Sequence, residues 1–171
     1  GSALAATWNT ELVEEIAALI GDDCKQYGVD VLLAPGMNIQ KNVLCGRNFE
    51  YYSEDPYLSG LMAASYTLGV QSTGVGVSLK HLAANNQETG RYSLSSDVTE
   101  RAFREIYLRG FDYAVSLGDP YSVMTSYNLI NGRPASESGN MMNVLRNDFG
   151  FNGFVMTDWG VLGDRIEKIN A

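Results

Sequence analysis

The stretch GFVMTDWG, residues 153–160, indicates the fold class and leads to the rest of the chain. An apolar run, Phe154 to Met156, follows a glycine and ends at the carboxylate of Asp158, with Trp159 directly after it. Short apolar runs of this kind are typical of strands that a parallel sheet buries on both faces. A charge at the end of a buried strand is costly unless it is paired or used. The stretch therefore predicts a buried strand that presents Asp158 at its carboxyl end.

Working outward from this strand, apolar runs and helical periodicity alternate along the chain. The predicted strands are 29–36, 75–81 and 121–128, and the predicted helices are 10–27, 56–72, 100–117 and 139–149. Asp97 and Glu100 have the spacing of a capping pair for the helix at 100–117. A last helical turn is expected within 161–170. This order predicts one α/β domain whose parallel strands are joined by right-handed crossovers.

The connections between these elements differ in length. Helix-to-strand connections are short, whereas the strand-to-helix loops at 35–55 and 81–97 are long. Long loops in compact domains are usually functional. Both leave the carboxyl ends of strands, where parallel α/β proteins build their sites. We therefore expect the chemistry at this edge of the sheet.

The side chains expected at this edge are cations, amides, aromatic rings and one strand-end carboxylate. They are Arg47, Glu50, Tyr51, Lys80, His81, Arg91, Tyr127, Asn128, Asp158 and Trp159. Planar donors and amides hydrogen-bond hydroxyl groups, and aromatic rings stack on the C–H faces of sugars, so the set suits a neutral polyol. Structural roles are also open: Asp158 as a helix cap, His81 as a buried structural histidine, Arg47 and Arg91 as loop-bracing ion pairs, and Trp159 as a core residue.

Composition excludes several classes of protein. Apolar residues make up 45% of the 171 residues and charged residues 19%, which is typical of a globular domain. The formal net charge is −8 and no basic run occurs, which argues against a nucleic-acid partner. No apolar stretch approaches the roughly 20 residues of a membrane span. Neither a signal peptide nor any other feature indicates a compartment, which stays open.

Motifs for metals and cofactors are also absent from the sequence. The single histidine, His81, excludes a two-histidine metal site within the chain, and no glycine-rich phosphate-binding motif follows a strand. No GxSxG nucleophile motif occurs. Cys24 and Cys45 are interpreted as free thiols. We expect neither a metal nor a cofactor.

Four motifs carry a family resemblance: GRNFEYYSEDP (46–56), KHLAANNQE (80–88), VMTSYNLINGRPAS (123–136) and GFVMTDWG. Together they resemble family 3 glycoside hydrolases, the β-glucosidase group. The resemblance implies a retaining hydrolase that removes terminal non-reducing β-D-glucosyl residues, with Asp158 as nucleophile. It also implies that sugar-binding residues surround Asp158: Arg47, Lys80, His81 and Arg91 on ring hydroxyls, Tyr127 beside the nucleophile, and Trp159 as a wall of the first subsite.

Alternative functions stay open beside this one. The segment AANNQ carries no second histidine, which argues against the branch of the family that cleaves N-acetylglucosaminides. β-Xylosidase specificity is one alternative. A non-catalytic carbohydrate-binding module and a purely structural fragment are the others.

The resemblance further implies a partial (β/α)₈ barrel of four to five βα units, truncated at both ends. A sugar-binding aspartate and a second domain carrying the acid/base glutamate would lie outside the chain, and Gly1-Ser2 resembles a cloning remnant. We therefore expect weak or no activity from the isolated chain. Since four parallel strands cannot close a barrel, two architectures are open. One is an open sheet that associates with other copies through its edges, and the other is a flavodoxin-like doubly wound sandwich.

Overall fold

A four-stranded parallel sheet forms the centre of the computed structural model, which describes residues 1–161, 166 and 169. Its strands are β1 (Val31–Leu32), β2 (Gly76–Leu82), β4 (Ser122–Thr125) and β7 (Phe154–Thr157), in that spatial order. All three pairings are parallel, as predicted. β1 is shorter than the predicted strand because only Val31 and Leu32 pair continuously with β2, and Gly36 rejoins β2 by a single bridge to Lys80.

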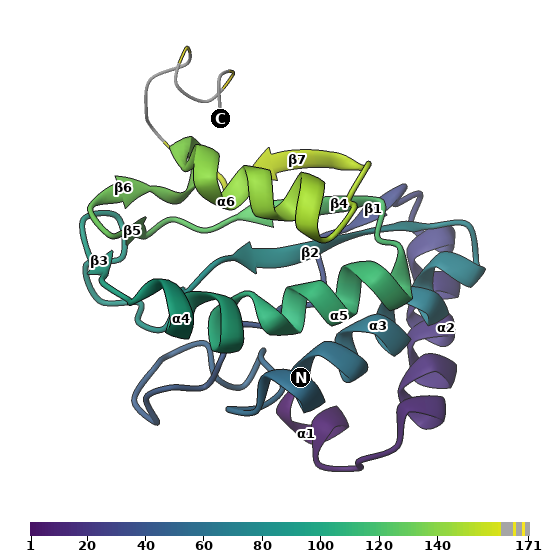
Figure 1. Cartoon of the computed structure of the whole chain (residues 1–171). Helices are drawn as coiled ribbons and strands as arrows, with labels where there is room; N and C mark the ends of the chain where they lie inside the picture. Colours follow the sequence, from purple (N-terminus) through teal and green to yellow (C-terminus); the bar gives the residue numbers. More distant parts are fainter. Residues whose placement is uncertain (162–165, 167–168, 170–171) are drawn as a thin grey trace.

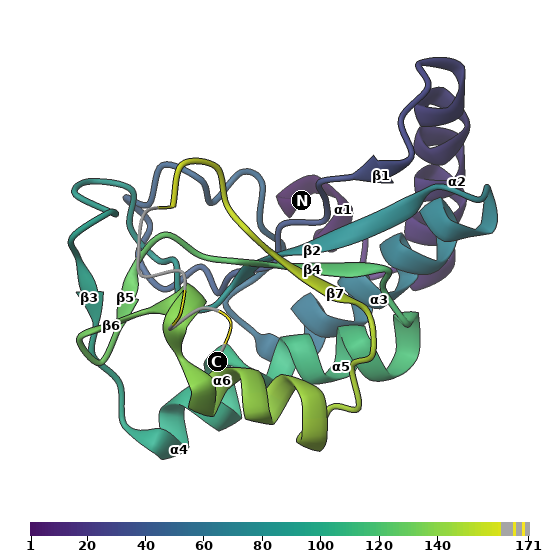
Figure 2. The same ribbon diagram turned by 90° about the horizontal axis from the view of Figure 1, so that it is seen from above.

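The spatial order of these strands follows their order in the chain. With right-handed connections, such an order places every crossover helix on the same face of the sheet. Figure 2 shows α3 (Pro56–Ser72), α5 (Arg109–Gly118) and α6 (Gly139–Asn143) along one side of the sheet. A doubly wound sheet needs a reversal of strand order, and none occurs among these four strands. The flavodoxin-like alternative is therefore wrong, and the open sheet of consecutive βα units is confirmed.

The long helices match the predicted ranges, and side-chain caps explain where they start. α2 (Thr10–Gln26) begins after Asn9, whose side chain accepts from the backbone N–H of Leu12. α3 begins after Asp55, which accepts from the N–H of Tyr57, with Pro56 in the first turn. The third helical stretch consists of α4 (Glu100–Ala102), a π-helical turn (Phe103–Tyr107) and α5, and a second π-helical turn (Val144–Asp148) continues α6.

The predicted capping pair at Asp97 and Glu100 is wrong. Thr99 caps α4, and its side chain accepts from the N–H of Ala102. Asp97 lies two residues too early because Ser95 and Ser96 are held in a strand, and its carboxylate accepts from the Ser95 hydroxyl. The helical turn expected within 161–170 lies largely outside the described residues.

A second, three-stranded sheet that the sequence did not lead us to predict lies at the carboxyl ends of the main strands (Figure 1). It consists of β3 (Ser95–Ser96), β5 (Leu129–Ile130) and β6 (Arg133–Pro134). β5 and β6 form a hairpin through Asn131 and Gly132, whose φ angles are 49° and 80°. Both values suit a type I′ turn, for which Asn-Gly is a preferred sequence.

The N-terminal residues also take part in the fold. The short helix α1 (Ser2–Ala5) was not predicted. The Ser2 hydroxyl donates to the carbonyls of Asn48 and Tyr51, and the Gly1 amino group donates to the carbonyl of Phe49. The residues interpreted as a cloning remnant therefore brace the first long loop.

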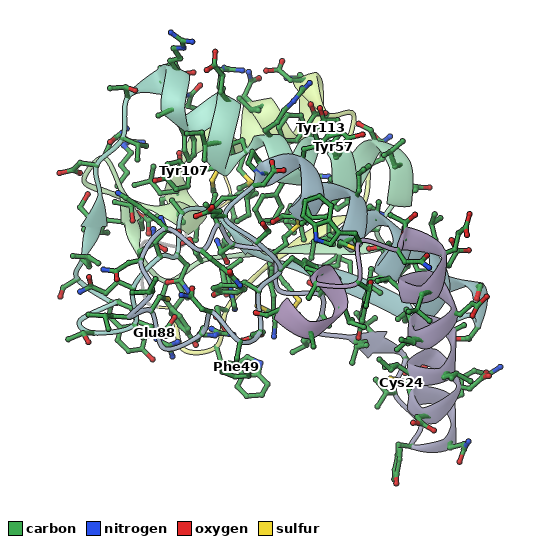
Figure 3. The ribbon with its side chains drawn as sticks, turned by 90° about the horizontal axis from the view of Figure 1, so that it is seen from below. Cys24, Phe49, Tyr57, Glu88, Tyr107 and Tyr113 are labelled. Carbon is green, nitrogen blue, oxygen red and sulfur yellow. The ribbon has the colours of Figure 1, made fainter. Side chains whose placement is uncertain are left out.

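The hydrophobic core lies between the sheet and its helices. Val77, Leu79 and Val123 of the sheet belong to one buried cluster with Phe111 and other side chains of α3 and α5. Tyr57 of α3 and Tyr113 of α5 meet edge to face, with ring centroids 5.4 Å apart (Figure 3). Cys24 and Cys45 are both free thiols, as predicted. Among the described residues no helix combines the length and the apolar character that crossing a membrane requires.

The contact between α2 and α3 depends on Gly69. A β-carbon at this position would lie 2.2 Å from the carbonyl oxygen of Glu14 and 2.7 Å from Cβ of Ala17. We expect Gly69→Ala to lower the free energy of unfolding by about 1–3 kcal/mol through overpacking. This is opposite in sign to the gain of about 0.5–1 kcal/mol that Gly→Ala gives in an unhindered helix. Urea denaturation checks this, with Ser65→Ala on the same helix as a control that changes stability by less than about 0.5 kcal/mol.

β1 and β7 form the two edges of the main sheet within the described residues. Unpaired edge strands favour association with further strands. Self-association through these edges stays a prediction.

Candidate active site

Strand register brings the predicted site residues to one end of the sheet. Lys80 lies opposite Met124 in the β2–β4 ladder, and Thr125 lies opposite Thr157 in the β4–β7 ladder. His81, Tyr127 and Asp158 therefore leave neighbouring strands at about the same level. The loop 36–55 and the small sheet lie at this same end (Figure 1).

A break in the ladder sets the position of His81. The register between β2 and β4 shifts between Lys80 and Leu82, so His81 has no direct partner on β4. Its backbone is held by Asn38 instead: His81 N–H donates to Asn38 Oδ1 at 2.9 Å, and Asn38 Nδ2 donates to the carbonyl of His81 at 2.8 Å. Bulges of this kind re-aim side chains next to active sites.

The carboxylate of Asp158 has polar neighbours on two sides. Its Oδ1 accepts from the backbone N–H of Trp159 at 2.8 Å, and its Oδ2 lies 3.5 Å from Nε2 of His81. Tyr127 lies beside it and donates its hydroxyl to the carbonyl of Trp159 at 2.6 Å. Burial and the negative charge of Asp158 raise the pKa of Tyr127 to about 12, so its hydroxyl stays protonated.

Two cations of the site share one carboxylate. Glu50 accepts from Nε and Nη2 of Arg47 at 2.8 and 3.0 Å, and from Nζ of Lys80 at 2.8 Å. Burial disfavours the Glu50 anion, but hydrogen bonds and charges from Arg47 and Lys80 outweigh burial and lower its pKa to about 2. The sequence listed Glu50 among the loop residues without giving it this role.

The third cation, Arg91, lies on the side of the site formed by Tyr127. It pairs with Glu88 at 2.6 Å, and its guanidinium carbon lies 4.2 Å from the ring centroid of Tyr127. Glu88 also accepts from Nδ2 of Asn85 at 3.0 Å. Figure 3 shows Glu88 among the loops at this end of the molecule, with Phe49 projecting outward from the neighbouring loop.

His81 is neutral in this environment. Burial, followed by the positive charges of Arg47 and Lys80, lowers its pKa to about 3. The site then combines three cations, Arg47, Lys80 and Arg91, with the carboxylates of Glu50, Glu88 and Asp158. Equal numbers of opposite charges suit an uncharged ligand.

Trp159 differs from the other predicted residues because its side chain is 74% exposed. This exposure rules out the structural interpretation of Trp159 as a core residue. An exposed indole directly after Asp158 is available for stacking on a ligand.

Two hollows of the structure lie outside this cluster. One of about 410 Å³ is at the amino-terminal ends of the strands, between Asp30, Gly76 and Tyr121. Another of about 390 Å³ is lined by polar residues of the loops, including Asn86 and Asp97. Within the part of the chain that the structure describes, no group of three or more His, Cys, Asp or Glu side chains is arranged to hold a metal ion.

The structure thus brings Arg47, Lys80, His81, Arg91, Tyr127 and Asp158 into one connected cluster. Four further residues tie the cluster together: Asn38, Glu50, Tyr51 and Asn85. Glu50 and Tyr51 were expected at this edge without a specific role, whereas Asn38 and Asn85 were not predicted. The sequence carried one signal for them, since all four lie in the two long loops at 35–55 and 81–97.

Comparisons with known proteins point to one family. The profile described as "Glycosyl hydrolase family 3 N terminal domain" matches residues 1–170. Thermostable beta-glucosidase B of Acetivibrio thermocellus is 49% identical over 169 residues, which are 98% of this chain and 22% of that protein. Exo-alpha-(1->6)-L-arabinopyranosidase of Bifidobacterium longum is 47% identical, with the same coverage of 98% and 22%.

Solved structures agree with this. Beta-glucosidase 3B from Thermotoga neapolitana, solved in complex with alpha-D-glucose, superposes with a TM-score of 0.96 at 54% identity, over 98% of this chain and 24% of that one. The chain spans about a fifth of the length of the curated relatives it matches. The match over the whole chain and its level of identity show that the chain belongs to glycosyl hydrolase family 3, in the region of that family's N-terminal domain.

Proposed function

We propose that this chain supplies the nucleophile and the sugar-binding wall of a retaining β-glycoside hydrolase that acts on terminal β-D-glucosyl residues. The observation that carries the proposal is the placement of Asp158: a strand-end carboxylate held by Trp159 N–H, faced by His81 and flanked by Tyr127. Relatives named as β-glucosidases, at 44–49% identity, support the choice of reaction.

The nucleophilic step needs a carboxylate that is ionised and aimed. An oxygen of Asp158 attacks the anomeric carbon, a covalent bond forms between them, and the bond to the aglycone oxygen breaks with its electron pair. A carboxylic acid protonates that oxygen, and the same group later activates the water that releases the sugar. The resemblance assigns this acid to a second domain, so we expect little or no turnover from this chain alone.

The remaining side chains fit roles in holding the sugar. Arg47, Lys80 and Arg91 are fixed by carboxylates and can donate further hydrogen bonds to ring hydroxyls. His81 lies between them and Asp158. The exposed face of Trp159 can stack on the sugar ring.

Relatives named as arabinopyranosidases favour a second candidate sugar. An arabinopyranose, like the xylose of the β-xylosidase alternative, is a pentopyranose without the exocyclic CH₂OH of glucose. Comparison of aryl glycosides of the three sugars separates these specificities. A carbohydrate-binding role without turnover is the remaining alternative, and calorimetry with glucose or gluconolactone tests it.

Mechanism-based trapping tests the proposed nucleophile in the chain itself. With 2-deoxy-2-fluoro-β-D-glucosyl fluoride, the Asp158–C1 bond forms as the C1–F bond breaks, and fluoride leaves with the electron pair. Because fluoride is a good leaving group, the step does not depend on the acid. We expect one fluoroglucosyl group per chain, located on Asp158 by peptide mass spectrometry.

The matched control for trapping is Asp158→Asn, which removes the anionic oxygen but keeps the shape of the side chain. We expect no label on this variant. A label on another residue of the wild-type chain would contradict the assignment of Asp158. Glucose binding without any label would instead support the carbohydrate-binding alternative.

A further inference from the structure

A line of hydrogen-bonding groups runs from Glu88 to Asp158 through the interior of the site. Asn85 Nδ2 lies 3.0 Å from Glu88 Oε1 and 3.1 Å from the hydroxyl of Tyr51. That hydroxyl lies 3.1 Å from Nδ1 of His81, and Nε2 of His81 lies 3.5 Å from Asp158 Oδ2. Which ring nitrogen of His81 carries the proton follows from the direction of each of these contacts.

The amide of Asn85 has only one favourable orientation. Glu88 is paired with the guanidinium of Arg91 and is therefore an acceptor. The group of Asn85 that faces it must be the NH₂ group, since a carbonyl oxygen there would face a carboxylate. The second hydrogen of this NH₂ group is donated to the oxygen of Tyr51.

The proton of the Tyr51 hydroxyl then has to point elsewhere. Tyr51 is 0% exposed, and burial keeps its pKa well above the usual value, so the hydroxyl is protonated and shielded from water. Its other hydrogen-bonding neighbour in the described part of the chain is Nδ1 of His81. If Tyr51 donates to Nδ1, the proton of the neutral imidazole is on Nε2, where it faces the carboxylate of Asp158.

The opposite tautomer satisfies fewer groups. Asn38 Oδ1 lies 3.2 Å from Nδ1 and could accept from an Nδ1–H. That oxygen already accepts from the backbone N–H of His81, so it loses no bond if Nδ1 is unprotonated. With the proton on Nδ1, by contrast, the buried hydroxyl proton of Tyr51 has no acceptor on the histidine. The lone pair of Nε2 then faces the carboxylate of Asp158, and both arrangements are costly.

We propose that Tyr51 is a positioning residue that fixes His81 in the Nε2–H tautomer, so that the histidine presents a hydrogen-bond donor to Asp158. Glu88 and Asn85 fix the direction of the Tyr51 hydroxyl. The consequence for catalysis, a nucleophile oriented by a donor before the sugar arrives, rests on the proposed function. The tautomer itself does not.

The single histidine of the chain makes the test direct. In protein labelled with ¹⁵N only at histidine, two-bond ¹H–¹⁵N correlation spectra at neutral pH report one imidazole. We expect a protonated, pyrrole-like Nε2 and an unprotonated, pyridine-like Nδ1. A wild-type spectrum with the proton on Nδ1 would overturn the proposal.

Tyr51→Phe removes the donor to Nδ1 with little change in shape. Asn38 Oδ1 is then the remaining polar neighbour of Nδ1, so we expect the proton to move to Nδ1 and the two nitrogen signatures to exchange. Tyr52→Phe is the matched control, because Tyr52 is the next residue, 4% exposed, and its phenol faces Tyr66 rather than the histidine. It should leave the spectrum unchanged.

The outcomes separate this proposal from the proposed function. An Nε2–H histidine that persists in Tyr51→Phe would show that Tyr51 does not set the tautomer. If Tyr51→Phe does not fold, the wild-type spectrum still decides whether His81 presents a donor. A failure to trap a sugar on Asp158 would leave the tautomer result intact.

Discussion

Replacing Asp158 by asparagine is expected to lower turnover of an aryl β-glucoside on the order of 10⁴-fold or more, with little change in KM. Removal of a catalytic nucleophile has effects of this size in other enzymes that act through covalent intermediates. The amide keeps the hydrogen bond from Trp159 N–H but cannot form the glycosyl ester. The sugar contacts proposed for Arg47, Lys80 and Arg91 do not depend on the lost charge, which is why sugar binding should persist.

Turnover is best measured in a chimera. Residues 1–170 would replace the matching segment of the Thermotoga neapolitana enzyme, whose backbone they superpose on with a TM-score of 0.96. Asp148→Asn is the matched control, since Asp148 ends the π-helical turn after α6 and forms an exposed ion pair with Arg104. That control should change the rate less than about twofold, because an exposed ion pair contributes little to stability and does not touch the site. An Asp158→Asn chimera of near-normal activity would refute the assigned nucleophile.

Acid is expected to destabilise the chain through its one histidine. The pKa of His81 is about 3 in the folded state, against an ordinary value of 6.5. Between these values the unfolded chain binds a proton that the folded chain excludes, so stability falls as the pH falls below about 6.5. The slope is about 1.4 kcal/mol per pH unit, which gives a loss of about 2 kcal/mol between pH 7.5 and pH 5.0.

The His81→Gln variant isolates this effect because glutamine does not titrate. Urea denaturation at both pH values should show about 2 kcal/mol less acid destabilisation in the variant than in the wild type. Glu50 does not disturb this comparison. Its pKa is lowered from 4.5 to about 2, so its stabilisation is present above about pH 4.5 and is lost only as the pH falls from there towards 2, below the interval. Equal slopes for the two proteins would mean that His81 is not buried in its neutral form.

Much of the fold could be predicted because its elements have strong local patterns. The predicted ranges of α2 and α3 differ from the observed ones by a residue or less, and Asn9, Asp55 and Pro56 mark where these helices start. The alternation of strands and helices along the chain predicted the parallel sheet. What local patterns could not supply was the spatial order of the strands, which distinguishes an open barrel segment from a doubly wound sheet. The hairpin at Asn131 and Gly132 did have a local signal, and it was overlooked.

The site was partly predictable for a different reason. Residues that end strands, such as His81 and Asp158, are placed by topology alone, and they do lie close together. Asn38, Glu50 and Tyr51 come from a long loop whose path depends on contacts with other segments. Sequence shows which groups such a loop carries but not which of them turn inward, so the carboxylate shared by Arg47 and Lys80 could not be foreseen.

The agreement between strand order and chain order has a consequence for how such a domain is built. A sheet of this kind can be lengthened at either edge by one more strand and helix of the same handedness, without threading a segment between existing neighbours. Each added unit places its own strand-to-helix loop at the carboxyl end of the sheet. Functional side chains can therefore be added at that end without changing the strands and helices already present. The residues at this end of the sheet can therefore vary with little effect on the strands and helices that carry the fold.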